Sequence, residues 1–263
     1  MLHLFKYGIP LAVCLGIVWR FVSKDSTEYA VFKLLTETTD RQRKYRAWIV
    51  KSFLFFTGST LILLAVERRL DSLTTLPVEF HSLYAWLRTL VPKPQFVNRG
   101  FLAGFGLDLV GSIVGGIFLG KALARKRLNG KTAMAGDVEP LLPRNGAETG
   151  WAVLLSLNAG LSEELFFRLL LPLLLANLFG NALFAFGVAV IIFGLVHLYQ
   201  GVAGVIATTI LGFALTGLYL WTGSLWIAIG AHTLLDLFGL VIRPNLARMV
   251  RARDKEAPST SLS

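Results

Sequence analysis

Six titratable side chains stand in the long apolar stretch 151–242, and they are its only acidic or basic groups. They are Glu163, Glu164, Arg168, His197, His232 and Asp236. An ionised group near the middle of a bilayer costs at least ~2.5–3.5 kcal/mol on insertion scales, so pairing, hydration or function must offset the cost. This concentration is the strongest functional signal in the sequence.

The spacing of the first three groups predicts different roles for the two adjacent glutamates. Glu164 and Arg168 are four residues apart, which places them on one face of a helix and predicts an intrahelical ion pair with a structural role. Glu163 points about 100° away from Glu164 on the same helix. We therefore expect Glu163 to lack that partner and to be available for chemistry.

The two histidines lie on two further helices, and Asp236 follows His232 by four residues. Polar faces of membrane helices turn toward the interior of a bundle, so Glu163, His197, His232 and Asp236 can surround one water-filled cavity. There the carboxylate can take a proton from water, one imidazole can orient that water, and another donor can stabilise the oxyanion formed on a carbonyl. The predicted chemistry is hydrolysis of a peptide bond without a nucleophilic serine.

The elements that must position these groups are membrane spans. Of the 263 residues, 54% are hydrophobic and only 16% are charged, and the mean hydropathy is +0.62; this composition excludes an ordinary soluble domain. Apolar stretches of about 17–25 residues can cross a bilayer as helices. We predict about seven, at 7–22, 47–66, 100–119, 151–178, 181–199, 202–221 and 225–242. The first could also be a signal peptide, but it lacks a convincing cleavage site, and an uncleaved span is favoured.

These spans predict an all-α fold, a polytopic transmembrane helical bundle. We expect an N-terminal membrane segment at 1–150, with three spans and basic loops, and a catalytic four-helix core at 151–242. A basic and disordered tail follows at 243–263. The segment 80–91 reads as an interfacial or re-entrant helix.

Charge and cysteine content exclude other classes of protein. The net charge is +10, but the basic residues cluster beside the spans, where Lys and Arg set topology. We therefore expect no nucleic-acid partner, and we expect the loop after the first span, the loop after the third and the tail on the cytoplasmic side. The single cysteine, Cys14, excludes a disulfide framework and a cysteine zinc site.

Three motifs carry a resemblance to a known family. Glu163 to Arg168 fits EExxxR, Phe193 to His197 fits FxxxH, and His232 to Asp236 fits HxxxN/D. In this order, on consecutive membrane helices, they resemble the CAAX-protease and bacteriocin-processing family, abbreviated CPBP. The resemblance covers about a third of the chain, and the first three spans match no motif of the family.

The resemblance implies an intramembrane glutamate-type endopeptidase. It implies that Glu163 is the general base, that His197 helps to hold the attacking water, and that His232 with Asp236 forms the oxyanion site. Many members have Asn where this chain has Asp236, and an ionised carboxylate cannot donate to an oxyanion. Asp236 must then be protonated, or it serves only to orient His232.

The family is often described as metalloproteases, which leaves the cofactor open. No cofactor is favoured, because the chain has no HExxH motif and a zinc ion would need Glu163, His197 and His232 as its three protein ligands. Zinc on those three residues is retained as the alternative. For Asp108, in the glycine-rich third span, a packing or interfacial role is favoured over a role in a site.

The expected partners are membrane lipids and a membrane-bound or lipidated peptide substrate, and the expected location is a multi-pass position in the bacterial plasma (inner) membrane. Whether the substrate is prenylated stays open. Two other functions also remain. Intramembrane Glu, His and Asp can build the proton relay of a proton-coupled transporter, and a catalytically silent member of the family could act as an immunity or scaffold protein.

Overall fold

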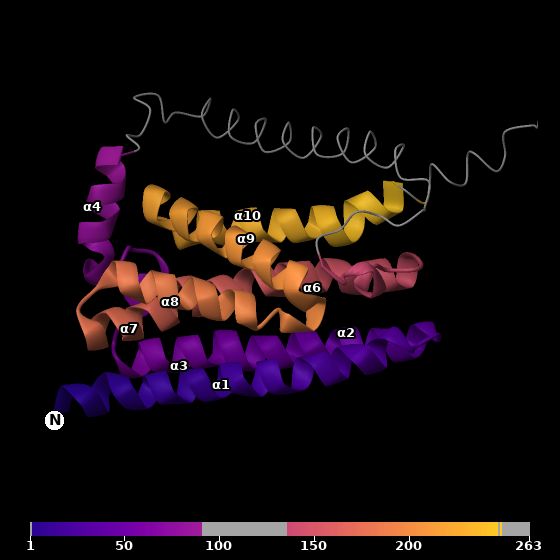
Figure 1. Ribbon diagram of the computed structural model, residues 1–263, viewed down its shortest axis with the longest axis horizontal. Helices are drawn as coiled ribbons and strands as arrows, with labels where there is room; N and C mark the ends of the chain where they lie inside the picture. The colour runs from indigo at the N-terminus through magenta and orange to yellow at the C-terminus, as the bar shows by residue number, and fades with distance from the viewer. Residues whose placement is uncertain (1, 91–135, 247, 249–263) are drawn as a thin grey trace, which may run out of the picture.

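The computed structural model describes residues 2–90, 136–246 and 248, and within these ranges every regular element is a helix. The N-terminal part contains α1 (Leu2–Lys33), α2 (Thr38–Ser52), η1 (Phe53–Gly58), α3 (Ser59–Val66), η2 (Leu70–Leu73), η3 (Val78–Phe80) and α4 (His81–Leu90). The C-terminal part contains η4 (Glu139–Leu141), α6 (Gly146–Glu164), η5 (Leu165–Leu170), α7 (Leu171–Phe179), α8 (Ala182–Leu195), η6 (Leu198–Gln200), α9 (Gly201–Thr222), α10 (Leu225–Leu237) and η7 (Phe238–Ile242). The all-α bundle that the sequence predicts is confirmed (Figure 1).

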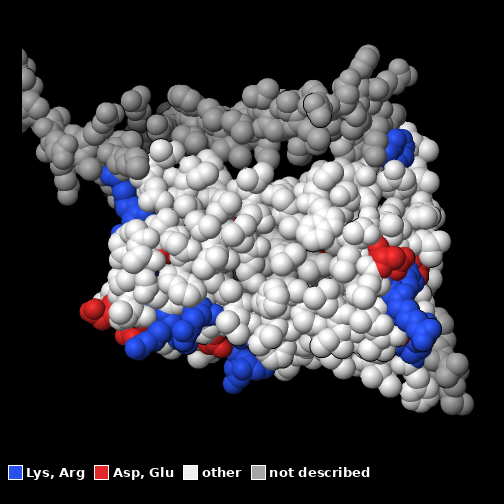
Figure 2. Space-filling view, turned by 180° about the vertical axis from the view of Figure 1, so that it is seen from behind, with Lys and Arg blue, Asp and Glu red and all other residues white. Residues whose placement is uncertain are grey.

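Four of the described helices are long and apolar enough to cross a membrane: Leu4–Lys33, Thr38–Val66, Leu198–Thr222 and Leu225–Leu246. A shorter apolar helix, Ala182–Leu195, lies among them. The space-filling view shows charged side chains gathered toward two ends of one face, with a broad band of uncharged residues between them (Figure 2). An uncharged band between two charged ends is the surface expected of a protein that spans a bilayer.

The expected spans agree with the described helices to different extents. The spans expected at 202–221 and 225–242 correspond to α9 and to α10 with η7, whereas the helices at 151–178 and 181–199 are not among the four candidate spans. A helix, α4, is present at the segment 80–91. The first two spans are longer than expected, because α1 continues to Lys33 and the second helix begins at Thr38. The span expected at 100–119, with Asp108, lies outside the described residues.

Tight turns join the helices of the C-terminal part. α7 ends at Gly180, whose φ of 68° is a left-handed conformation that glycine adopts without strain. The next residue, Asn181, begins α8 by accepting a hydrogen bond from the Phe184 backbone N–H at 2.9 Å. The start of α6 is capped in the same way, by Asn145 and the backbone N–H of Glu148 at 2.9 Å.

Close packing of α6 against α10 brings two motif-bearing helices together. A Cβ atom added at Gly160 would lie 2.1 Å from Thr233 Oγ1 and 2.9 Å from its backbone nitrogen. Only glycine therefore allows this approach, as small residues commonly do between membrane helices. Because Gly160 lies one turn before the glutamates, the contact sets their distance from α10.

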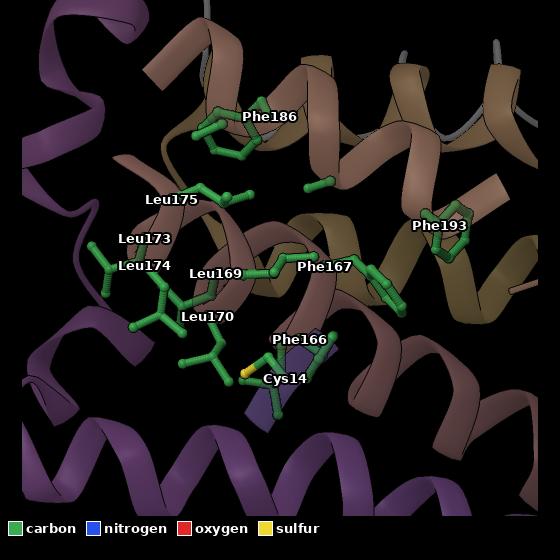
Figure 3. Close-up of a cluster of buried hydrophobic side chains, with 14 of the residues drawn as sticks. Cys14, Phe166, Phe167, Leu169, Leu170, Leu173, Leu174, Leu175, Phe186 and Phe193 are labelled. Atoms are coloured by element: carbon green, nitrogen blue, oxygen red, sulfur yellow. The ribbon is translucent and has the colours of Figure 1, made fainter. Parts of the chain in front are cut away.

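One hydrophobic cluster joins the N-terminal helices to the C-terminal ones. It runs from Cys14 in α1 to Phe166 and Phe167 in η5 and Phe193 in α8 (Figure 3). Phe56, in the second helix, lies 4.8 Å from Phe166 between ring centroids. The part of the chain without family motifs therefore packs directly on the part that carries them.

The ends of the elements agree with the predicted topology. The junction of α1 and α2, the start of α6 and the C-terminal end of α10 lie at the same end of the bundle (Figure 1). The sequence predicted the basic segments beside these ends to be on one side of the membrane. The cluster Arg125–Arg127, which the sequence predicts in the loop after the third span, lies outside the described residues.

Candidate active site

Three helices bring the sequence-predicted residues together. Glu163 stands near the end of α6, His197 lies two residues after the end of α8, and His232 and Asp236 lie in α10. Glu163 Oε2 is 3.9 Å from His197 Nε2 and 3.9 Å from His232 Nε2. This oxygen is buried and accepts no hydrogen bond from the described residues. The separations are too long for direct hydrogen bonds and suit groups that share a small polar molecule.

His197 is oriented by the helix that precedes it. Its Nδ1 lies 2.8 Å from the backbone oxygen of Phe193. A carbonyl oxygen can only accept, so Nδ1 carries the proton, and Nε2, which faces Glu163, holds the lone pair of the neutral ring. The four-residue spacing of FxxxH thus fixes the tautomer through the backbone of Phe193.

The side chain of Phe193 fills the space between the motifs. Its ring centroid is 4.9 Å from that of His197 and 6.2 Å from that of His232. The guanidinium carbon of Arg168 lies 4.1 Å from the same centroid, within the range of a cation–π interaction. Phe193 therefore contacts all three motifs, a role that its sequence position alone did not indicate.

Glu164 has two partners on two helices. Its Oε1 lies 3.0 Å from Arg168 Nη1, the ion pair that the spacing predicts, and 2.7 Å from His232 Nδ1. The side chains of Glu164 and Arg168 are 0% and 1% exposed. Since the carboxylate accepts from Nδ1, it turns His232 Nε2 toward Glu163. The contact with His232 joins residues 68 positions apart, and sequence spacing could not reveal it.

Asp236 lies near His232 without a hydrogen bond to it. Its Oδ2 is 3.8 Å from His232 Nε2, and the hydrogen bond that orients the ring comes from Glu164. Asp236 and Glu163 thus both face the Nε2 edge of one imidazole. A positioned carboxylic acid on this edge could donate to an oxyanion, whereas an ionised one could only accept.

A cavity of about 120 Å³ opens beside Glu163 and His197. Its polar lining includes Asp25 from α1 and Lys51 and Ser52 from α2. The remaining wall is largely aromatic and aliphatic and contains Phe21, Tyr29, Trp48, Phe56, Leu141, Leu155, Val196 and Tyr199. The N-terminal helices therefore form part of the site, which the search for motifs missed.

A π-helix lies next to the glutamates. The α-helical pattern of α6 ends at Glu164 and gives way to η5, a π-helical segment that contains Arg168. Single π-turns inserted in α-helices occur frequently at functional sites. The second helix contains another one, η1, immediately after Lys51 and Ser52. Both irregular segments directly follow residues that face the cavity or its catalytic groups.

The donor set does not form a metal site as the side chains are placed. In a tetrahedral zinc site with bonds of ~2.0–2.1 Å, two ligand atoms lie about 3.4 Å apart. Glu163 Oε2 is 3.9 Å from each imidazole nitrogen. Across residues 2–90 and 136–246, no group of three His, Cys, Asp or Glu side chains has the geometry to hold a metal ion.

Comparison with known families supports the resemblance carried by the three motifs. Residues 145–238 match the family model of Rce1-like type II CAAX prenyl endopeptidases, which confirms the suspected relationship for this part of the chain. The match spans α6 to α10 and contains Glu163, His197, His232 and Asp236. No curated protein and no solved structure compared with the chain matches it. The match is to a family of CAAX-type proteases, and together with the apolar helices it indicates an integral membrane protein.

Proposed function

We propose that the protein is an intramembrane endopeptidase that hydrolyses a peptide bond with a water activated by Glu163. The observation that carries the proposal is the position of Glu163 Oε2, 3.9 Å from the Nε2 atoms of both His197 and His232. A water between these groups can give a proton to the carboxylate and be oriented by an imidazole lone pair. The adjoining cavity gives a peptide access to that water.

The reaction needs only groups that the chain supplies. Glu163 takes a proton from water while the water oxygen forms a bond to the carbonyl carbon, and the carbonyl oxygen becomes an oxyanion. The C–N bond then breaks as the protonated Glu163 gives its proton to the leaving nitrogen. His197, with its proton held on Nδ1 by Phe193, accepts a hydrogen bond from the attacking water at Nε2.

His232 is the proposed oxyanion donor. In its imidazolium form it keeps the Nδ1–H bond to Glu164 and has a second N–H, on Nε2, that can donate to the oxyanion. The Glu164 carboxylate balances that positive charge, and Arg168 holds Glu164 in place. Asp236, protonated, supplies a further donor near Nε2.

The proposed substrate is a membrane-bound or lipidated peptide, and the proposed location is the bacterial plasma membrane, with lipids around the apolar helices. The reaction above uses no metal. A catalytic zinc would have to draw Glu163 and both histidines together from their present spacing.

The test is a comparison of the cleaved termini of membrane proteins in cells that carry the wild-type chain or Glu163→Gln. The amide keeps the shape of the side chain and loses its basicity, so we expect a defined set of termini to disappear while the variant remains folded. The melting temperature of the purified variant is the control for folding. Identical termini with wild type and with a folded Glu163→Gln protein would refute the proposed function.

A further inference from the structure

Two charged residues, one from each of the first two long helices, line the cavity. Asp25 belongs to the candidate span Leu4–Lys33 and Lys51 to the candidate span Thr38–Val66. Lys51 Nζ is 2.6 Å from Asp25 Oδ1. The side chain of Asp25 is only 20% exposed and that of Lys51 only 17%. Lys51 lies in the apolar part of its helix, where an ionisable group is costly and usually marks a functional path or pocket, whereas Asp25 lies in a polar stretch near the end of α1.

The hydrogen-bond donors that the N-terminal helices contribute to this wall are already used. Lys51 Nζ contacts Asp25 Oδ1 and both carboxylate oxygens of Glu28, the latter at 3.4 Å. The Ser52 hydroxyl donates to the Trp48 backbone oxygen at 2.9 Å. The Tyr29 hydroxyl donates to the backbone oxygen of Asp137. The spare donors of the lining are neutral ones, the hydroxyl of Tyr199, which accepts from Gln200 Nε2, and the second amide N–H of Asn158, so a carboxylate would find no free cationic donor.

Acceptors remain available on the same wall. Asp25 Oδ2 accepts no hydrogen bond from the described part of the chain, whereas Oδ1 is taken by Lys51. The ionisable lining groups Asp25, Glu163 and Lys51 have one more negative than positive charge when all are ionised. Glu28 neutralises Lys51 further without lining the cavity. The wall therefore favours a cation over an anion.

The apolar part of the wall is also suited to a cation. Aromatic rings of Trp48, Phe56 and Tyr199 line the cavity, and faces of aromatic rings attract ammonium and guanidinium groups. The rings of Phe21 and Tyr29 also line it and already carry the ammonium groups of Lys51 and Lys33. The volume of about 120 Å³ is roughly an order of magnitude above the ~10–15 Å³ that one water needs. A single side chain of a substrate can enter.

We infer that this cavity is a subsite for the side chain of an Arg or Lys residue within two positions of the scissile bond of the substrate. Asp25 is its specificity-determining residue, through its Oδ2, and Lys51 holds Asp25 in place. The inference rests on the proposed endopeptidase function, since Glu163 and His197 share the cavity.

The experiment uses the full chain reconstituted in lipid vesicles and a peptide whose sequence surrounds a cleavage site identified by the termini comparison. Four positions are tested, two before and two after the scissile bond. At each position one peptide carries Arg and a matched peptide carries citrulline, which keeps the shape and lacks the charge. The ratio of kcat/KM for the two peptides is measured for wild type, Asp25→Asn and Glu28→Gln. Glu28→Gln is the matched control, because it also removes a carboxylate beside Lys51 but from outside the cavity wall.

For wild type we expect cleavage of the Arg peptide about tenfold faster at one position, a ratio that corresponds to about 1.4 kcal/mol. Asp25→Asn should reduce the ratio to about twofold or less, and Glu28→Gln should preserve it. A wild-type ratio near one at all four positions, with cleavage still occurring, would overturn the subsite and leave the endopeptidase intact. That ratio decides the question even if Asp25→Asn does not fold. No cleavage of any peptide by wild type would overturn the proposed function, and the subsite with it.

Discussion

Replacing Arg168 with alanine tests whether the buried ion pair stabilises the bundle. Arg168 is 1% exposed and Glu164 is 0% exposed, with 3.0 Å between Nη1 and Oε1. Removing one partner of a buried pair leaves an uncompensated charge and typically destabilises by about 3–5 kcal/mol. Two further terms add to this loss: the contact with the Phe193 ring at 4.1 Å and the cavity left by a large side chain. One term opposes it, because Glu164 keeps its hydrogen bond to His232 at 2.7 Å.

We therefore expect a loss of about 3–5 kcal/mol for Arg168→Ala, which corresponds to a decrease in melting temperature of about 6–20 °C at ~2–4 °C per kcal/mol. The assay is thermal unfolding of the detergent-solubilised protein, followed by loss of the monodisperse peak on size-exclusion chromatography. The matched control is Arg43→Ala. Its ion pair with Asp40 has nearly the same length, 3.1 Å, but the two side chains are 76% and 45% exposed.

An exposed pair contributes about 1 kcal/mol or less, so Arg43→Ala should melt within a few degrees of wild type. Equal melting temperatures for Arg168→Ala and Arg43→Ala would refute the reasoning, because burial is the main difference between the pairs. A double variant that also removes the charge of Glu164 should recover part of the loss, since no unpaired charge then remains buried.

Three further predictions follow from the site. Gly160→Ala should destabilise the protein by about 1–3 kcal/mol, because its Cβ would lie 2.1 Å from Thr233 Oγ1. Gly150→Ala, on the same helix, would meet nothing within 4 Å and should not destabilise; thermal unfolding of both variants checks this. Asp236→Asn should retain peptide cleavage, because the amide can donate to the oxyanion near His232 without needing a proton; loss of cleavage in a folded variant would show that the carboxylate is required. Extensively chelated enzyme should retain cleavage, and loss on chelation with return on stoichiometric zinc would contradict the metal-free reaction.

The sequence predicts the helices and the local pairs well, because both depend on short-range periodicity. Hydropathy locates α9 and α10 closely, since Gly and short polar turns mark their ends. The Glu164–Arg168 pair follows from i,i+4 spacing on one helix. The bond from His232 to Glu164 does not follow, since it depends on how closely α10 approaches α6 at Gly160.

The contribution of the N-terminal helices was missed for a specific reason. Hydropathy ended the first span at residue 22 and began the second at residue 47, so Asp25 fell in a loop and Lys51 near a span end. In the structure, the two helices continue to Lys33 and from Thr38, and both residues lie well inside them. A charged pair that neutralises itself between two helices lowers the hydropathy of each helix and so conceals its length. The sequence signal that could have revealed Lys51 is a single charge in otherwise apolar surroundings, whereas Asp25 stands among polar residues and gives no such signal.

The adjacent glutamates show why one carboxylate can act on a substrate while its neighbour cannot. The 100° turn between successive helical residues directs Glu164 into a site where one oxygen contacts both Arg168 and His232, at 0% exposure. It directs Glu163 toward the cavity, where the side chain is 17% exposed and Oε2 accepts no hydrogen bond from the described residues. Because the Glu164 side chain is enclosed and its contacting oxygen is shared, it can fix the orientation of His232 but cannot reach a substrate. Glu163 lacks such partners and lines the cavity, so it is the carboxylate that can exchange a proton with water. Because Glu164 orients His232, it also determines where the Nε2 atom of that ring lies relative to Glu163. The two glutamates therefore act on the same imidazole of α10.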